Sequence, residues 1–244
     1  MRTHEAPLSR AFTRLELAIL LATLLLLAAI AFPGLASTKP HSERAMCASN
    51  LRQIGHAFQL WADDHGNRNP WAVPISEGGT FEPSGPGNPQ RNNIYYQVGW
   101  VSNELVTPKM LICPSDQGVG APRRMASDFS TDTLTGGFFG PGYKNLALSY
   151  IVGLHTAVDA SRSVLSGDRN IQWDFVGVNC TLRLVTFGLV TPRLGSVWTN
   201  SIHGEVGNLL FNDGGVDQLS SSGLRRALAV PNQGDPGSHH FLAP

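Results

Sequence analysis

The sequence has 244 residues and a formal net charge of zero, from 18 basic and 18 acidic residues. This composition offers no basic face of the kind that nucleic-acid binding requires. Charged residues make up only 15% of the chain, and 26 Gly and 16 Pro predict many loops, without the period of three of collagen. The length allows one sizeable domain and an amino-terminal anchor.

The amino-terminal segment combines a basic leader with an apolar run. The run from Leu17 to Phe32 contains no charge, Gly or Pro, which predicts a membrane helix. The basic residues lie before it, at Arg2, Arg10 and Arg14. Their position predicts a cytoplasmic amino terminus and a carboxy-terminal domain on the periplasmic or extracellular side.

The residues around Ala11 resemble the processing signal of type IV prepilins and type II secretion pseudopilins. A small residue after Arg10 is followed by Phe12-Thr13, by Glu16 and by the apolar run. The resemblance implies that prepilin peptidase cuts between Ala11 and Phe12 and that the new amino terminus is methylated. Glu16 and Pro33 then become residues five and twenty-two of the mature chain, where the family typically has Glu and Pro. Arg14 departs from the family, which usually has an apolar residue there.

Glu16 has two interpretations. In a fibre of staggered subunits, its carboxylate would pair with the Phe12 amine of a neighbour, because an unpaired charge in apolar surroundings is costly. This assembly role is the interpretation that the resemblance favours. Alternatively, Glu16 only marks a helix amino terminus, where the helix dipole favours an anion.

An ordinary secretory signal is the alternative for the first 36 residues. Its basic and apolar regions would be followed by cleavage after Ala36, behind the small residues of Gly34-Leu35-Ala36. Such signals do not require Glu16, so the prepilin-type interpretation is preferred.

An amphipathic helix is predicted from Ser42 to Asp64. Apolar residues recur at spacings of four, three, four and three, which places them on one helical stripe: Cys47, Leu51, Ile54, Phe58 and Trp61. This stripe needs a packing partner, and a sheet formed later in the chain is the expected one. The helix should end at the turn residues around Gly66.

The remainder of the chain predicts short strands separated by long loops. Residues 67–93 and 117–142 are rich in turn-forming residues. Leu146–Val152 and Ser163–Ser166 are predicted strands, whereas Ile94–Val101 is compatible with a strand or a helical turn.

A hairpin is the clearest local prediction near the carboxyl terminus. Asp213-Gly214 separates two strand-like runs and predicts a primed two-residue turn, with Phe211 opposite Val216. Ser222 is then predicted to cap a short helix that extends to Val230.

Three cysteines follow the apolar run, and in the predicted orientation they face an oxidising compartment. Cys47 and Cys113 are the candidates for a disulfide, and Cys180 is the remaining cysteine. Closing this loop would stabilise the fold by about 4 kcal/mol in the chain-entropy model. A pair of buried thiols is the alternative.

A second resemblance involves His203, which is followed after nine residues by Asp213-Gly214. This spacing resembles the carboxy-terminal signature of a large bacterial group of prepilin-like proteins of undefined role. Further parallels with this group are Cys47-x-x-Asn50-Leu51, Asp64-x-Gly66-x-x-x-Pro70, Cys113-Pro114-Ser115-Asp116 and Gly167-Asp168.

No catalytic residues are predicted, because the sequence has no nucleophile motif and the segment from His203 to Asp213 more often orients a turn. No metal site is predicted either. Calcium is considered as a ligand because Asn212, Asp213 and Asp217 offer oxygen atoms, but the twelve-residue calcium loop is missing. The pair His239-His240 is interpreted as part of a solvated tail.

The predicted fold is α+β and pilin-like: a long amino-terminal helix, half transmembrane and half amphipathic, packs on a small antiparallel sheet with long loops. The expected parts are a leader (1–11), a transmembrane helix (12–35), its amphipathic continuation (36–66), an extracytoplasmic domain (67–230) and a loose tail (231–244).

The predicted function is a structural pilin-like or pseudopilin subunit of a type II secretion or type IV pilus-like system, anchored in the inner membrane. Its expected partners are prepilin peptidase, other pilin-like subunits with their assembly machinery, and the membrane, with no nucleic acid. A membrane-anchored extracytoplasmic binding protein that does not polymerise is the alternative, and an enzyme is not expected.

Overall fold

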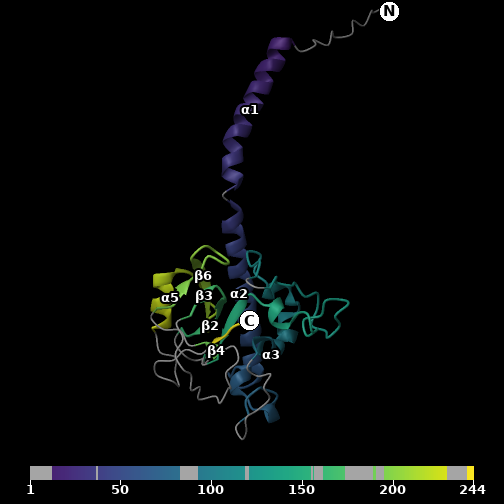
Figure 1. The fold of residues 1–244 in the computed structure, drawn as a ribbon, viewed down its shortest axis with the longest axis vertical. Helices are drawn as coiled ribbons and strands as arrows, with labels where there is room; N and C mark the ends of the chain where they lie inside the picture. Colours follow the sequence, from purple (N-terminus) through teal and green to yellow (C-terminus); the bar gives the residue numbers. More distant parts are fainter. Residues whose placement is uncertain are drawn as a thin grey trace, which may run out of the picture. The chain divides into compact units, whose positions relative to one another are not determined.

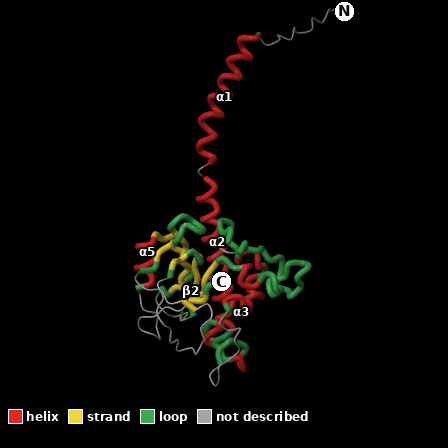
Figure 2. Tube along the Cα trace, viewed as in Figure 1, coloured by secondary structure: helices red, strands yellow, loops and turns green. Residues whose placement is uncertain are grey.

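The computed structural model describes residues 13–36, 38–82, 93–118, 121–154, 156, 162–173, 189–190, 195–229 and 241–244. The chain divides into two compact units, Met1–Ser42 and Glu43–Pro244. Figure 1 shows the order of their elements, and Figure 2 shows how much of the second unit consists of loops.

The first unit contains helix α1 (Arg14–Ala36). Thr13 and Glu16 begin it with a capping box. The Thr13 amide donates to Glu16 Oε2 at 2.8 Å, and the Glu16 amide donates to Thr13 Oγ1 at 3.2 Å. The large apolar side chains described in α1 are all exposed: Leu15, Leu17, Ile19, Leu20, Leu21, Leu24, Leu25, Leu26 and Leu27.

The predicted fold class, with one long amino-terminal helix that is half transmembrane and packs on a small sheet, is wrong. Two helices, α1 and α2 (Thr38–Asp64), take its place, and the boundary between the two units falls within α2. In the part of the chain that the structure describes, no helix combines the length and apolarity needed to cross a membrane. Pro40 agrees with a second helix that begins at Thr38, since proline has no backbone N–H and suits the first turn of a helix.

The second unit contains short helices and strands after α2. The helical elements are η1 (Pro70–Ala72), η2 (Ile75–Glu77), α3 (Ile94–Gly99), α4 (Ser102–Leu105), η4 (Pro108–Leu111), η5 (Lys144–Ala147) and α5 (Ser221–Leu228). The strands are β1 (Tyr150–Gly153), β2 (Val164–Asp168), β3 (Ile171–Gln172), β4 (Leu189–Val190), β5 (Val197–Trp198), β6 (Val206–Phe211), β7 (Val216–Ser220) and β8 (Phe241–Leu242). The ambiguous segment at Ile94 is therefore helical.

Among the described residues, six strands form an antiparallel sheet in the order β4-β8-β1-β2-β6-β7, and β3 pairs with β5. Successive side chains of a strand point to opposite faces. In β6, Leu210 joins one apolar cluster, whereas Leu209 and Phe211 join the other. In β1, Tyr150 and Ile151 alternate in the same way. The sheet thus has a buried apolar cluster on each face.

The first cluster contains the apolar stripe of α2. Its stripe residues are buried, as the helical periodicity predicts: Cys47, Leu51, Ile54, Phe58 and Trp61. Helix and sheet lie close together at Gly55, where an added Cβ would stand 2.9 Å from a methyl group of Leu210. The Gln59 side chain also donates to the Asn212 carbonyl oxygen at 3.2 Å. The apolar stripe of α2 therefore belongs to the core of the second unit.

The second cluster covers the other face and includes α5. Leu224 of α5 is fully buried in it, and Leu228 packs against it, so both lie on one side of the helix. The cap differs from the prediction. Ser220, rather than Ser222, accepts a hydrogen bond from the Gly223 amide, and the helix ends at Leu228.

The β6–β7 hairpin has a longer turn than predicted. Val216 pairs with Leu210 rather than with Phe211, because the Phe211 amide donates to Gly215 and the loop contains three residues. Gly214 has a φ of 79°, whereas Asp213 has no positive φ, so the primed turn is wrong. The Gly215 amide donates to Asp213 Oδ1 at 2.8 Å, which stabilises this wider turn.

The last residues of the chain form a strand, whereas the sequence predicts a loose tail. Phe241 and Leu242 form β8, which pairs with both β1 and β4, and both side chains are fully buried, one on each face of the sheet. His239-His240 lies outside the described residues.

Candidate functional site

Residues from four separate sequence motifs meet around a disulfide between Cys47 and Cys113. The two cysteines are 66 residues apart in the sequence. The Nε2 atom of His203 lies 3.4 Å from Cys113 Sγ and 3.5 Å from Asp168 Oδ2. The structure thus brings together the two disulfide candidates, the signature histidine and the Asp of Gly167-Asp168. Cys180, expected to be the unpaired cysteine, lies outside the described residues.

Asp168 lies at the end of β2 and is completely buried. Its Oδ2 accepts hydrogen bonds from the Asn208 backbone amide at 2.7 Å and from the Asn208 side chain at 2.8 Å. Asn208 belongs to β6, so this carboxyl group joins two neighbouring strands. The Oδ1 atom has no hydrogen-bond partner among the described residues.

Burial controls the protonation of both acid and imidazole. It raises the pKa of Asp168 to about 7, although hydrogen bonds from Asn208 partly oppose the shift. Burial also lowers the pKa of His203 to about 4, and the charge of Arg44 adds to this shift. Between these two pKa values both groups are mainly uncharged. In this pH range the contact between His203 and Asp168 therefore joins two uncharged groups.

Asp116 forms a second buried polar group beside the first. The guanidinium of Arg169 donates two hydrogen bonds to it, from Nε to Oδ2 at 2.7 Å and from Nη2 to Oδ1 at 2.6 Å. Arg123 Nε lies 3.4 Å from Oδ2, and the Gly118 amide donates to Oδ1 at 2.9 Å. Burial opposes ionisation of Asp116, but the hydrogen bonds and charge of Arg169 outweigh it and hold the pKa of this carboxyl below its usual value.

The remaining motif residues attach α2 to its neighbours. Asn50 donates through Nδ2 to the Ile112 carbonyl oxygen at 3.2 Å and to the Tyr150 hydroxyl at 3.3 Å. Ser115 donates to Glu43 Oε2 at 2.8 Å. Together with the disulfide, these contacts attach the part of α2 that lies in the second unit to residues 112–115 and to β1.

The two ends of the carboxy-terminal signature have different partners. His203 faces the disulfide and Asp168, whereas Asp213 lies 3.4 Å from Arg162 Nε, in the turn that contains Gly214. The structure therefore does not place His203 and Asp213 together as an acid–base pair. Asp217 also binds Arg162, at 2.8 Å. Both carboxylates considered for calcium thus contact the same arginine.

One group of side chains in the described part of the chain has the composition of a metal site. The ligand atoms of Cys47, Cys113 and His203 all lie within 4.8 Å of one another. Thiolate is the form of cysteine that binds metals, and in the disulfide neither sulfur is a thiolate. The oxidised protein therefore offers only the imidazole of this group.

The amino-terminal processing residues are described only in part. Ala11 and Phe12 lie outside the described residues, whereas Glu16 forms the capping box with Thr13. This geometry corresponds to the simpler of the two interpretations of Glu16, in which it marks a helix start. The assembly role stays a prediction.

Sequence reasoning missed two features of the buried site. It did not predict Arg169 as the partner of Asp116, or Asn208 as the partner of Asp168. The available signal was that Asp116 and Asp168 both belong to the short motifs of the second resemblance. No protein-family model, curated protein or solved structure matches this chain.

The chemistry of this site follows from its burial. The side chains of His203 and Asp168 are 2% and 0% exposed, so a substrate has no access to the pair. Buried polar groups that are hydrogen-bonded to several elements specify how those elements pack. The arrangement is thus best suited to holding α2, β2, β6 and the Cys113–Asp116 segment in one geometry.

Proposed function

We propose that this chain is a structural subunit of a type II secretion or type IV pilus-like system, processed by prepilin peptidase and held at the inner membrane by its amino-terminal segment. The observation that carries the proposal is the apolar surface of α1. Leu15 and Leu25 are 72% and 71% exposed, and the large apolar side chains described between them are exposed as well. A contiguous apolar surface of this kind marks a site of association with other subunits or with lipid.

The position of the disulfide supports a mechanical role for the second unit. Cys47 lies four residues after Glu43, where that unit begins. A force applied through the amino-terminal helices of an assembled subunit would reach Cys47 and pass through the disulfide to Cys113. The contacts of Asn50 and Ser115 support the same junction. A subunit that transmits load needs this junction to resist unravelling.

Glu16 supplies the assembly step of the proposal. In the capping box its carboxylate accepts from Thr13, at 2.8 Å from the backbone amide and 2.9 Å from the hydroxyl. Cleavage between Ala11 and Phe12 would create an ammonium group one residue before Thr13. In an assembly, the Phe12 ammonium of a neighbouring subunit would compete with Thr13 for Glu16, and an ion pair in apolar surroundings would fix the stagger.

Mass spectrometry of the mature amino terminus in native membranes tests the processing. N-methyl-Phe12 is the expected terminus, and Ala11→Leu should leave the precursor uncut. A mature chain that begins at Ser37 would instead identify a secretory signal and overturn the proposal.

Cysteine crosslinking along α1 tests the assembly. The expected result is a ladder of crosslinked species that Glu16→Gln reduces strongly and Thr13→Val leaves intact. Thr13→Val is the matched control because it removes the hydroxyl of the capping box but keeps the Glu16 charge. Equal losses in both variants would limit Glu16 to helix capping. Methylated protein that forms no ladder even in the wild type would indicate the anchored binding protein that does not polymerise.

A further inference from the structure

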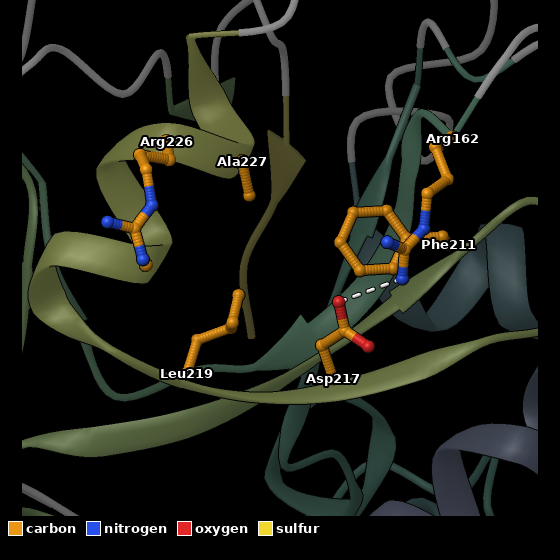
Figure 3. A pocket seen from close by; sticks show the side chains of 7 residues that line it. Arg162, Phe211, Asp217, Leu219, Arg226 and Ala227 are labelled. Carbon is orange, nitrogen blue, oxygen red and sulfur yellow. Dashed lines mark hydrogen bonds and ion pairs between the residues drawn. The ribbon is translucent and has the colours of Figure 1, made fainter.

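A surface pocket of about 280 Å³ lies beside α5 (Figure 3). Its walls come from α5, from the hairpin strands β6 and β7, and from Arg162, which precedes β2. Three apolar side chains form its interior: Phe211, Leu219 and Ala227. Three charged side chains stand around them: Arg162, Asp217 and Arg226.

The interior of the pocket is part of the folded core. Phe211 is 5% exposed and belongs to the apolar cluster beneath α5, and Leu219 and Ala227 pack against that cluster. The guanidinium of Arg162 lies over the Phe211 ring, 4.5 Å from its centroid. A ring contributed by a ligand would therefore meet a fixed apolar wall that does not have to rearrange.

The two arginines of the pocket differ in their partners. Arg162 contacts two carboxylates, Asp217 at 2.8 Å and Asp213 at 3.4 Å, so its charge is matched. The guanidinium of Arg226 is exposed, and no described side chain pairs with it. Figure 3 shows Arg226 and Arg162 on opposite sides, with Leu219 and Ala227 nearer to Arg226. One side of the pocket thus carries an unmatched, planar cation next to apolar surface.

We propose that this pocket binds a small aromatic carboxylate, with the carboxylate on Arg226 and the ring against Phe211, Leu219 and Ala227. Arginine presents a rigid fork of N–H donors that matches a carboxylate with two parallel hydrogen bonds. The cavity is slightly below the range of about 300–1,000 Å³ of pockets for drug-sized ligands, which favours one ring with a short acid chain. An aliphatic dicarboxylate is disfavoured because its second charge would lie on apolar surface beside Asp217.

Ligand binding to the full-length protein in neutral-detergent micelles tests this proposal. The probe is 3-phenylpropanoate, and its uncharged amide, 3-phenylpropanamide, is the matched ligand control. Titrations followed by saturation-transfer NMR, with protein-free micelles subtracted, should give a dissociation constant on the order of 1 mM for the acid. The amide should bind about tenfold more weakly, because it loses the charge-assisted hydrogen bonds.

Two adjacent arginines of α5 provide the protein control. Arg226→Gln should weaken binding of the acid about tenfold and leave binding of the amide unchanged. Arg225→Gln changes the net charge equally but lies outside the pocket lining, so it should change affinity less than about twofold. Ala227→Phe should fill the cavity and abolish binding of both probes, with unchanged circular dichroism showing that the fold is kept.

Three results would overturn the proposal. These are no saturable binding of the acid up to about 10 mM, equal binding of acid and amide, or equal effects of Arg226→Gln and Arg225→Gln. None of them depends on processing or assembly, so the pocket and the proposed structural function succeed or fail separately.

Discussion

The two faces of the sheet are stabilised by different means. The face covered by α2 has a disulfide, a buried neutral acid–imidazole contact and a buried carboxylate bound by Arg169. The face covered by α5 has an apolar cluster under a short helix, and a pocket opens at its edge. Among the described residues, the first face therefore adds a covalent bond and buried ionisable groups to its apolar cluster, whereas the polar contacts of the second face lie at its edge, at Arg162 and at the Ser220 cap. The first arrangement suits a fixed packing of α2 within the second unit, and the second suits a small binding site at the edge of the sheet.

Removing the disulfide should have the largest effect, confined to the α2 face. Replacing Cys47 and Cys113 by Ala releases a loop of 66 residues, and we expect a loss of about 4 kcal/mol in the free energy of unfolding. Urea unfolding followed by tryptophan fluorescence measures this loss. A loss below about 1 kcal/mol would show that the polar contacts around Asn50 hold α2 without the disulfide.

Truncating the centre of the other face should cost somewhat less. Leu224→Ala in α5 leaves a cavity in the second cluster, where Leu224 is fully buried, and should destabilise the protein by about 3 kcal/mol. The disulfide should still form, as alkylation under denaturing conditions would show. Leu228→Ala provides a matched control with a smaller loss, because Leu228 is only partly buried. Equal losses would mean that α5 does not depend on the burial of Leu224.

The pH dependence of stability should separate the two buried groups. The pKa of Asp168 is raised to about 7 in the folded state, so its contribution is present at low pH and is lost as pH rises toward 7. The pKa of His203 is lowered to about 4, so its contribution is present above pH 6.5 and is lost as pH falls. Between pH 4.5 and 6.5 the two slopes oppose each other, and wild-type stability should be nearly flat.

Single substitutions should reveal these slopes. Asp168→Asn keeps an acceptor for Asn208 and removes the acid, so stability should then rise with pH by about 1 kcal/mol per unit. His203→Gln removes the base, so stability should fall with pH by a similar amount. Urea unfolding at pH 4.5, 5.5 and 6.5 measures both. Parallel slopes in the two variants would contradict the assignment of the shifts to these groups.

Local patterns in the sequence predicted the α2 stripe and the presence of a hairpin, because both depend on residues close in the chain. The single long helix was wrong, since an apolar run and an amphipathic stripe do not show where one helix ends and the next begins. The role of β8 was missed because the two-residue segment at Phe241 has no pattern of its own. Its burial depends on pairing with β1, nearly ninety residues earlier in the sequence.

The buried site was predictable only as a set of isolated residues. Cys47 and Cys113 are candidates for a disulfide because Cys47 lies on the helical stripe and Cys113 ends an apolar run, and the structure joins them. His203 was instead assigned to a turn with Asp213. Pairing of His203 with Asp168 results from the neighbouring positions of β2 and β6, which no spacing along the chain encodes.

The smallest expected effect concerns the hairpin turn, where the register differed by one residue. Gly214 has a φ of 79°, and an added Cβ would meet only the Gln59 side chain at 3.6 Å, so conformation and not space requires glycine. Gly214→Ala should therefore cost about 1 kcal/mol, and Gly214→Asn less, because Asn tolerates the left-handed region.

Asp213→Gly then distinguishes the two turns. A primed turn requires a positive φ at position 213 as well, so glycine there would be neutral or stabilising. In the observed three-residue loop, Asp213→Gly instead removes the acceptor of the Gly215 amide and one partner of Arg162, and it adds chain entropy to the unfolded state. We expect a loss of about 1 kcal/mol in urea unfolding, and a gain in stability would favour the primed turn with Phe211 opposite Val216.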